Sequence, residues 1–202
     1  MKTFLKIVLL IAAFALSQPA SAAKNILVFG DSLSAGYGIA RDDSWVNLLQ
    51  QELKKKHPQF EVVNASISGE TTAGGLRRIG KALQEHHPEI VIVELGANDG
   101  LRGTNLAETE KNLDKIIGQT QKANARVLLL GIQLPPNYGP DYTRRFRTLY
   151  PRLAKKHDIT LVPFMLEGVL PEQFQADNLH PNAEAQPGIM RHILRSLMPL
   201  LD

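Results

Sequence analysis

The sequence predicts an α/β fold, an open three-layer α/β/α sandwich built around a five-stranded parallel sheet. Two observations lead to this prediction. Five short, nearly unbroken apolar runs are typical of parallel strands that are buried on both faces. Segments with helical spacing of apolar residues separate these runs, and repeated strand–helix units form parallel sheets with right-handed crossovers. The length of 202 residues fits a single domain.

Each expected strand is a run of β-branched residues or leucines with few polar interruptions. In chain order, the runs are Ile26–Phe29, Val62–Asn64, Ile90–Leu95, Val127–Leu130 and Leu161–Pro163. Because neither face of these runs is polar, helices must cover both faces of the sheet.

The expected helices are recognised by apolar residues spaced three and four apart, which form one stripe along a helix. The stripes lie within Trp45–Leu53, Leu76–Leu83, Leu113–Thr120, Tyr142–Leu153 and Ile189–Leu201. Ser44 directly precedes the first stripe and is a suitable N-cap.

The composition excludes several classes of protein. Hydrophobic residues make up 44% and charged residues 21%, so the chain is neither disordered nor fibrous. There is no cysteine, which excludes disulfides, thiolate metal sites and a cysteine nucleophile. The net charge of +3 includes Lys2 and Lys6 near the N-terminus, and the remainder is too small to favour nucleic acid as a partner. Histidines and carboxylates lack metal-ligand spacing, so we expect no metal and no cofactor.

The N-terminal segment has the layout of a secretory signal. A basic start precedes the apolar run Ile7–Leu16, and small residues follow up to Ala22. The run is shorter than the ~20 residues of a spanning helix, so no stable membrane anchor is expected. We therefore expect a signal peptide over 1–22, cleaved after Ala22 or Ala23, and one domain over 23–202. The mature protein is expected to be a periplasmic or secreted monomer.

Chemically distinctive residues follow the predicted strands, on the edge where parallel sheets bind their ligands. Ser32 follows the first strand, Gly69 the second and Asn98 the third. Asp177 and His180 follow the fifth strand through a longer segment. All five residues are therefore expected at one edge of the sheet.

These residue types are the components of acyl transfer. A serine hydroxyl needs a base, and histidine, with an unperturbed pKa of about 6.5, is mostly neutral at pH 7. Asp177 and His180 are three residues apart, so the carboxylate can orient the imidazole. The backbone N–H groups of Ser32 and Gly69 and the amide of Asn98 are candidate donors to an oxyanion.

Other residues compete for these roles. Ser32 is preferred as the nucleophile because it lies where the first strand turns into a helix. Alternative nucleophiles are Ser34, Ser66 and Ser68, and alternative acids are Asp31 and Asp99. Glu94 lies inside an apolar strand and needs a partner if it is buried, but the sequence does not identify one.

The candidate residues fall into four blocks, namely Gly30-Asp31-Ser32-Leu33-Ser34, Gly69, Gly96-Ala97-Asn98-Asp99 and Asp177-x-x-His180-Pro181. In these blocks the chain resembles the SGNH hydrolases, also called the GDSL family, over essentially the whole mature sequence. The longer stretches Gly30–Tyr37 and Val93–Gly103 resemble the bacterial periplasmic subgroup of acyl-CoA thioesterase/protease/lysophospholipase and arylesterase enzymes.

This resemblance implies a flavodoxin-like sheet, Ser32 as the nucleophile, and an oxyanion hole formed by Ser32, Gly69 and Asn98. It also implies a mobile substrate loop, and the expected substrate-binding residues are Leu134, Pro135, Pro136, Asn137 and Tyr138. Pro136 stands where the subgroup often has a small residue, which could stiffen this loop.

We expect a serine esterase and thioesterase that acts on short-to-medium acyl groups, with lysophospholipid as a further substrate. One alternative is a carbohydrate deacetylase that acts on cell-wall or exported polysaccharide, because the same catalytic blocks serve such esterases. The other is a non-catalytic periplasmic binding module with the same fold.

Overall fold

The computed structural model describes residues 23–202, and the expected signal segment lies outside the described residues. Its single sheet is parallel, with the strand order β2-β1-β3-β4-β5. The strands are β1 (Lys24–Gly30), β2 (Phe60–Asn64), β3 (Ile90–Glu94), β4 (Arg126–Leu130) and β5 (Thr160–Val162). They coincide with the five expected runs to within two residues at each end.

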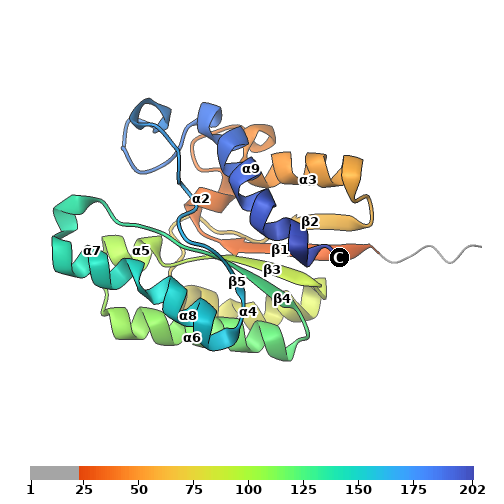
Figure 1. The fold of residues 1–202 in the computed structure, drawn as a ribbon, viewed down its shortest axis with the longest axis horizontal. Helices are drawn as coiled ribbons and strands as arrows, with labels where there is room; N and C mark the ends of the chain where they lie inside the picture. Colours follow the sequence, from red (N-terminus) through yellow and green to blue (C-terminus); the bar gives the residue numbers. More distant parts are fainter. Residues whose placement is uncertain (1–22) are drawn as a thin grey trace, which may run out of the picture.

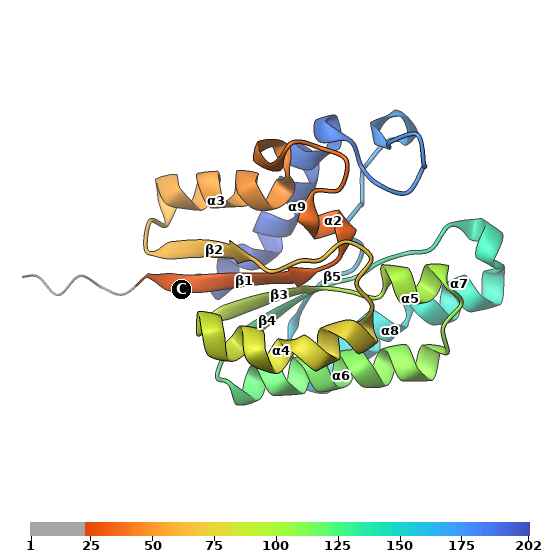
Figure 2. The ribbon, with the colours of Figure 1, turned by 180° about the vertical axis from the view of Figure 1, so that it is seen from behind.

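Helices cover both faces of this sheet, which confirms the three-layer fold. Helices α3 and α9 lie on one face, and α4, α6 and α8 lie on the other (Figures 1 and 2). The helices are α2 (Ser32–Ala35), α3 (Trp45–Lys56), α4 (Thr72–His86), α5 (Ala97–Leu101), α6 (Leu106–Lys122), α7 (Pro140–Arg147), α8 (Leu149–His157) and α9 (Gln186–Leu197). Within residues 23–202, none of the helices has the length and apolarity needed to cross a membrane.

Short 3-10 helices occur in the connecting segments. They are η1 (Arg41–Asp43), η2 (Pro136–Tyr138), η3 (Pro171–Gln173), η4 (Ala183–Ala185) and η5 (Met198–Leu200). Three of them, η2, η3 and η4, lie in the segments that follow β4 and β5, where substrate-binding and catalytic residues are expected.

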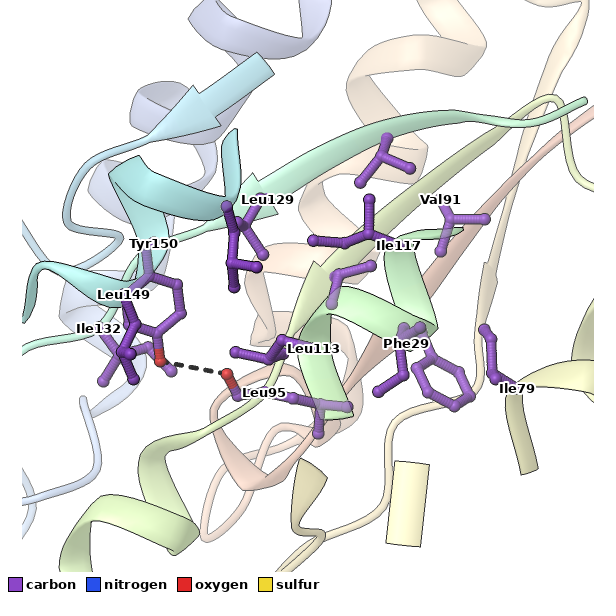
Figure 3. Packing of buried hydrophobic residues seen from close by; sticks show 14 of the residues in the cluster. Phe29, Ile79, Val91, Leu95, Leu113, Ile117, Leu129, Ile132, Leu149 and Tyr150 are labelled. Carbon is purple, nitrogen blue, oxygen red and sulfur yellow. Dashed lines mark hydrogen bonds between the residues drawn. The ribbon is translucent and has the colours of Figure 1, made fainter. Parts of the chain in front are cut away.

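The core consists of two apolar layers that the sheet separates. Leu27 and Phe29 of β1 point into the layer beneath α4, α6 and α8 (Figure 3), whereas Ile26 and Val28 point into the layer beneath α3 and α9. All four side chains are completely buried. Strand residues alternate between faces, so burial of both faces explains why the strands are apolar without interruption.

The fourth apolar stripe, Tyr142–Leu153, is divided between two helices rather than one. Helix α7 ends at Arg147 and α8 begins at Leu149, on either side of Thr148. Pro151 explains the break, because its ring would clash with the Arg147 carbonyl in a continuous helix. The side chains on both sides of the break still pack in the core.

The switch point of the sheet lies between β1 and β3. From β1 the chain moves to β2 at one edge, and it then crosses back to β3 on the opposite side of β1. Gly30 at the end of β1 is in register with Glu94 at the end of β3. Sheets of this kind hold their ligands outside the carboxyl ends of the strands at this point.

Replacing Leu129 with alanine should destabilise the fold without altering the site. Leu129 is completely buried on the central strand β4, and such truncations typically cost about 2–5 kcal/mol. Urea unfolding measures this loss. Met198→Ala, at a side chain that is 39% exposed, should change stability by less than about 0.5 kcal/mol. Equal losses in the two variants would contradict this assignment of the core.

Candidate active site

Ser32 lies at a sharp strand-to-helix turn. It is the first residue of α2 and directly follows Asp31, the N-cap of that helix. An Asp31 carboxylate oxygen accepts a hydrogen bond from the Leu33 N–H at 3.0 Å, which closes the turn. Gly36, with φ of 76°, ends the helix after one turn. The Ser32 side chain therefore stands at the carboxyl end of β1, half-buried and facing the loops of other strands.

The segment between β5 and α9 brings His180 and Asp177 to Ser32. His180 Nε2 lies 2.8 Å from Ser32 Oγ, and His180 Nδ1 lies 2.6 Å from Asp177 Oδ2. An ionised carboxylate only accepts hydrogen bonds, so the Nδ1 atom carries the ring proton. Nε2 is then free to accept the serine proton. The structure therefore assembles the three predicted residues into a hydrogen-bonded chain.

Asp177 is fixed by the backbone that follows it. Its Oδ1 atom accepts hydrogen bonds from the N–H groups of Leu179 at 2.9 Å and His180 at 3.0 Å. Partial burial raises the pKa of Asp177, but the hydrogen bonds from the backbone and ring of His180 and from Leu179 outweigh it and bring the pKa to about 2. Asp177 is therefore ionised whenever it faces the imidazole at neutral pH.

Tyr37 and Gln175 support His180, and neither was predicted. The rings of Tyr37 and His180 are 4.6 Å apart. The backbone N–H of Gln175 donates to the His180 carbonyl. The side-chain amide of Gln175 donates to the carbonyls of Tyr37 and Pro181. We call this set of three bonds the Gln175 clamp. The sequence hinted only at a turn around Tyr37, because Gly36 and Gly38 flank it; both glycines have positive φ in the structure.

The predicted oxyanion donors converge on the same cleft as Ser32. Within residues 23–202, the N–H groups of Ser32 and Gly69 donate to no protein acceptor. The Asn98 amide nitrogen donates both to Asp31 Oδ2 at 3.1 Å and to the Glu70 carbonyl at 3.0 Å. Since an amide nitrogen has two hydrogens, an oxyanion would have to take one from its present partner.

The alternative residues have other partners. The Ser34 hydroxyl donates to Glu94 at 2.8 Å, away from His180. Asp99 accepts from the backbone N–H of Thr72 at 2.8 Å and from its hydroxyl at 2.6 Å, and so braces the start of α4. Asp31 braces the turn at Ser32. These contacts leave Ser32, His180 and Asp177 as the connected set.

A cleft of about 470 Å³ opens beside Ser32. Apart from His180, its lining contains no side chain that carries a charge. A further wall of the cleft comes from the segment between β5 and α9, and sequence analysis did not predict it. This wall contains Phe164, Leu166, Phe174 and Leu179.

The expected substrate loop contributes to the cleft in part. Leu134 and Pro135 line it, together with the preceding Gln133. Pro136, Asn137 and Tyr138 form η2 and lie outside the lining. The Tyr138 hydroxyl donates to the Leu101 carbonyl at 3.1 Å, which ties η2 to the end of α5.

A larger hollow of about 740 Å³ lies along β2, away from Ser32. Its lining contains none of Ser32, His180 and Asp177, so we do not assign a catalytic role to this hollow. β2 is an edge strand there, and the Gln50 side chain accepts a hydrogen bond from the Val62 N–H. In the part of the chain that the structure describes, His, Asp and Glu side chains form no group of three suited to hold a metal ion.

Comparison with known proteins agrees with this geometry. A model of the GDSL-like lipase/acylhydrolase family matches residues 28–186. Esterase TesA of Pseudomonas aeruginosa is 46% identical over 191 residues, which cover 94% of this chain and 95% of the relative. Thioesterase 1/protease 1/lysophospholipase L1 of Escherichia coli is 45% identical over 91% of this chain and 88% of the relative. A crystal structure of TesA superposes with a TM-score of 0.86, covering 88% of this chain and 99% of that chain at 46% identity.

Activity should fall on acidification while Asp177 keeps its charge. Because the pKa of Asp177 is about 2, the loss of activity above that pH reports protonation of other groups of the site, the imidazole base among them. We expect log kcat/KM to decline well above about pH 2. The Asp177 carboxylate itself becomes protonated only as the pH approaches about 2.

The pH profile is measured with a p-nitrophenyl ester, using Asp177→Asn as the test variant. This change reverses the tautomer that Asp177 imposes and should lower kcat by roughly 10⁴. Asp141→Asn removes an exposed carboxylate on α7 and should match the unmodified protein. Undiminished activity down to about pH 2, or equal effects of the two variants, would contradict the assignment.

Proposed function

This chain belongs to the GDSL-like lipase/acylhydrolase family, and on that premise we propose a role for each residue of its site. It is a serine hydrolase that acts on carboxylic ester and thioester bonds. The observation that carries the proposal is the connected chain Asp177–His180–Ser32 at the mouth of an apolar cleft.

Ser32 is the nucleophile and His180 is its general base. Nε2 takes the hydroxyl proton as Oγ attacks the carbonyl carbon, and the serine–acyl bond forms. Asp177 holds the ring in the required tautomer and stabilises the imidazolium. Tyr37 covers one face of the ring, where its π-electrons favour the positive charge that develops.

The carbonyl oxygen becomes an oxyanion in the tetrahedral intermediate. The N–H groups of Ser32 and Gly69 and the Asn98 amide donate to it. Of the two acceptors that Asn98 now serves, the neutral Glu70 carbonyl is weaker than the Asp31 carboxylate. The hydrogen that now reaches Glu70 is therefore the one that turns to the oxyanion, and the bond to Asp31 persists.

Collapse of the intermediate expels the leaving group. His180 returns its proton to an alkoxide or a thiolate, and the serine ester remains. A thiol, with a reference pKa near ~8.5, leaves more readily than an alcohol, so the same site handles thioesters without further residues. Water, activated by His180, then attacks the serine ester and releases the carboxylic acid.

Short-to-medium acyl groups are the proposed substrates, with lysophospholipid as a further one. The cleft lacks charged side chains beside His180 and presents an apolar wall, and each methylene buried there contributes about 0.8 kcal/mol. The same apolar lining disfavours the sugars of a carbohydrate deacetylase. In the expected substrate loop, Leu134 and Pro135 contact the acyl chain, and Pro136, Asn137 and Tyr138 support them from η2.

The mature enzyme is proposed to be a periplasmic or secreted monomer that consists of residues 23–202. Residues 1–22 would be its signal peptide, cleaved after Ala22 or Ala23. The position of β1 supports this division, because the strand begins at Lys24 and cleavage leaves every strand of the sheet intact.

Ser32→Ala should abolish turnover and leave the fold unchanged, because it removes one oxygen at a half-buried surface position. A fluorophosphonate probe should label the unmodified protein at Ser32 and leave the variant unlabelled. Ser68→Ala, which alters a second serine of the cleft, should still be labelled. Near-native turnover by Ser32→Ala would refute the nucleophile assignment, and absence of labelling in the unmodified protein would favour a binding module.

Pro136→Gly should alter the preference for acyl chain length. Pro136 begins η2, directly after the lining residue Pro135, and glycine would loosen a backbone that proline restricts. We expect the ratio of kcat/KM between long and short p-nitrophenyl esters to change severalfold. Pro58→Gly, in the loop between α3 and β2 at the opposite edge, is the matched control. Parallel chain-length profiles in all three proteins would remove the loop from specificity.

A further inference from the structure

Glu94 is a completely buried carboxyl group directly behind the site. It ends β3, where the rest of the strand is apolar. Its Oε2 atom accepts hydrogen bonds from the Asp31 N–H at 3.1 Å and from the Ser34 hydroxyl at 2.8 Å. Within residues 23–202, its Oε1 atom is buried and receives no hydrogen bond from any protein donor. An ionised carboxylate would leave that oxygen without compensation.

A second carboxyl group, that of Asp31, is buried beside Glu94, whose Oε2 atom accepts the Asp31 N–H. Two ionised carboxylates in one buried site repel each other, which favours a proton on one of them. Burial raises the pKa of Glu94 well above its ordinary value, and the neighbouring Asp31 charge raises it further. Burial also raises the pKa of Asp31, to about 6. The pair therefore holds one proton at neutral pH.

The hydrogen-bond partners indicate which group holds this proton. Both oxygens of Asp31 already act as acceptors, Oδ1 from the Leu33 N–H and Oδ2 from the Asn98 amide. Glu94 Oε2 is likewise an acceptor. Among the four carboxyl oxygens of Asp31 and Glu94, Oε1 of Glu94 is the one that accepts no hydrogen bond from residues 23–202, so it is the atom that can carry the proton.

We propose that Glu94 is a positioning residue that acts in its protonated form. Neutral Glu94 holds the turn at Ser32 through the Asp31 N–H and the Ser34 hydroxyl, and it leaves the Asp31 carboxylate ionised as the acceptor of the Asn98 amide. The effect reaches the reacting atoms through Asn98 and through the turn at Ser32, both of which Asp31 anchors. This inference rests on the proposed function, in which Asn98 donates to the oxyanion.

Groups from several elements face the pair. Tyr150 of α8 is completely buried, and its hydroxyl donates to the carbonyl of Leu95, the residue after Glu94, at 3.2 Å (Figure 3). Arg78 of α4 points a guanidinium nitrogen toward the Gly30 carbonyl at 3.5 Å, but it is paired with Glu70 at 2.6 Å. His180 favours the charged form of Asp31, and Asp99 adds negative charge near Tyr150.

Loss of the proton on Glu94 would place two buried negative charges side by side. The carboxylates would repel each other, and Asp31 would no longer be held in position. A glutamine at position 94 is the neutral equivalent of protonated Glu94. Its oxygen can accept from the Asp31 N–H and the Ser34 hydroxyl, and its amide stays uncharged at any pH.

The test compares Glu94→Gln and Glu94→Ala with the unmodified protein, using kcat and KM for a p-nitrophenyl ester from neutral to alkaline pH. We expect Glu94→Gln to keep kcat and KM within threefold at neutral pH and to extend activity to higher pH than the unmodified protein. Glu94→Ala should lower kcat at least tenfold with a smaller change in KM. Glu61→Gln, at an exposed side chain of β2, is the matched control and should change nothing.

An infrared difference spectrum between the unmodified protein and Glu94→Gln reports the proton directly, even if Glu94→Ala fails to fold. A band of a buried protonated carboxyl group at neutral pH, absent from Glu94→Gln, is expected. Absence of this band, native kcat in folded Glu94→Ala, or loss of kcat in Glu94→Gln as large as in Glu94→Ala would each overturn the proposal. Fluorophosphonate labelling at Ser32 in every variant separates these outcomes from failure of the proposed function, in which Ser32 itself would stay unlabelled.

Discussion

The pairing of Gly30 with Glu94 at the ends of β1 and β3 is the constraint on which the site depends. A side chain at position 30 would have its Cβ atom 2.6 Å from Glu94 Oε2, so only glycine leaves room for the carboxyl group. That register brings the turn at Ser32 and the loop at Asn98 to the same point of the sheet. Asp31 then bonds to both, and Ser32 and Asn98, the proposed nucleophile and oxyanion donor, are fixed relative to each other.

Most of the remaining structure provides the rigidity that this arrangement needs. Two apolar layers hold the strands in register, and the polar groups of the site occupy their carboxyl edge. A buried carboxyl pair is destabilising by itself, since desolvation disfavours charge. The proton it shares, the two N–H donors and the Ser34 hydroxyl offset that cost, and the surrounding core leaves the groups no other arrangement.

The sequence was sufficient to predict the strands, the layers and the hydrogen-bonded chain of Ser32, His180 and Asp177, because each depends on a local pattern at a fixed place in the fold. It was insufficient where contacts join distant segments. Tyr37 and Gln175 meet across 138 positions, and the partner of Glu94 depends on strand register. The break at Thr148 was encoded by Pro151, but the unbroken apolar stripe concealed it.

The Gln175 clamp reaches the two loops only through main-chain oxygens, those of Tyr37, His180 and Pro181. Every amino acid supplies such an oxygen, so the clamp survives a change of side chain at position 37. Natural variation can therefore reshape the rim of the cleft, including the exposed Tyr37 ring, while the backbone around His180 keeps its course. A mutation at the rim can therefore alter which substrates fit the cleft while the backbone that carries His180 stays in place, and at position 37 it removes only the contact between the two rings.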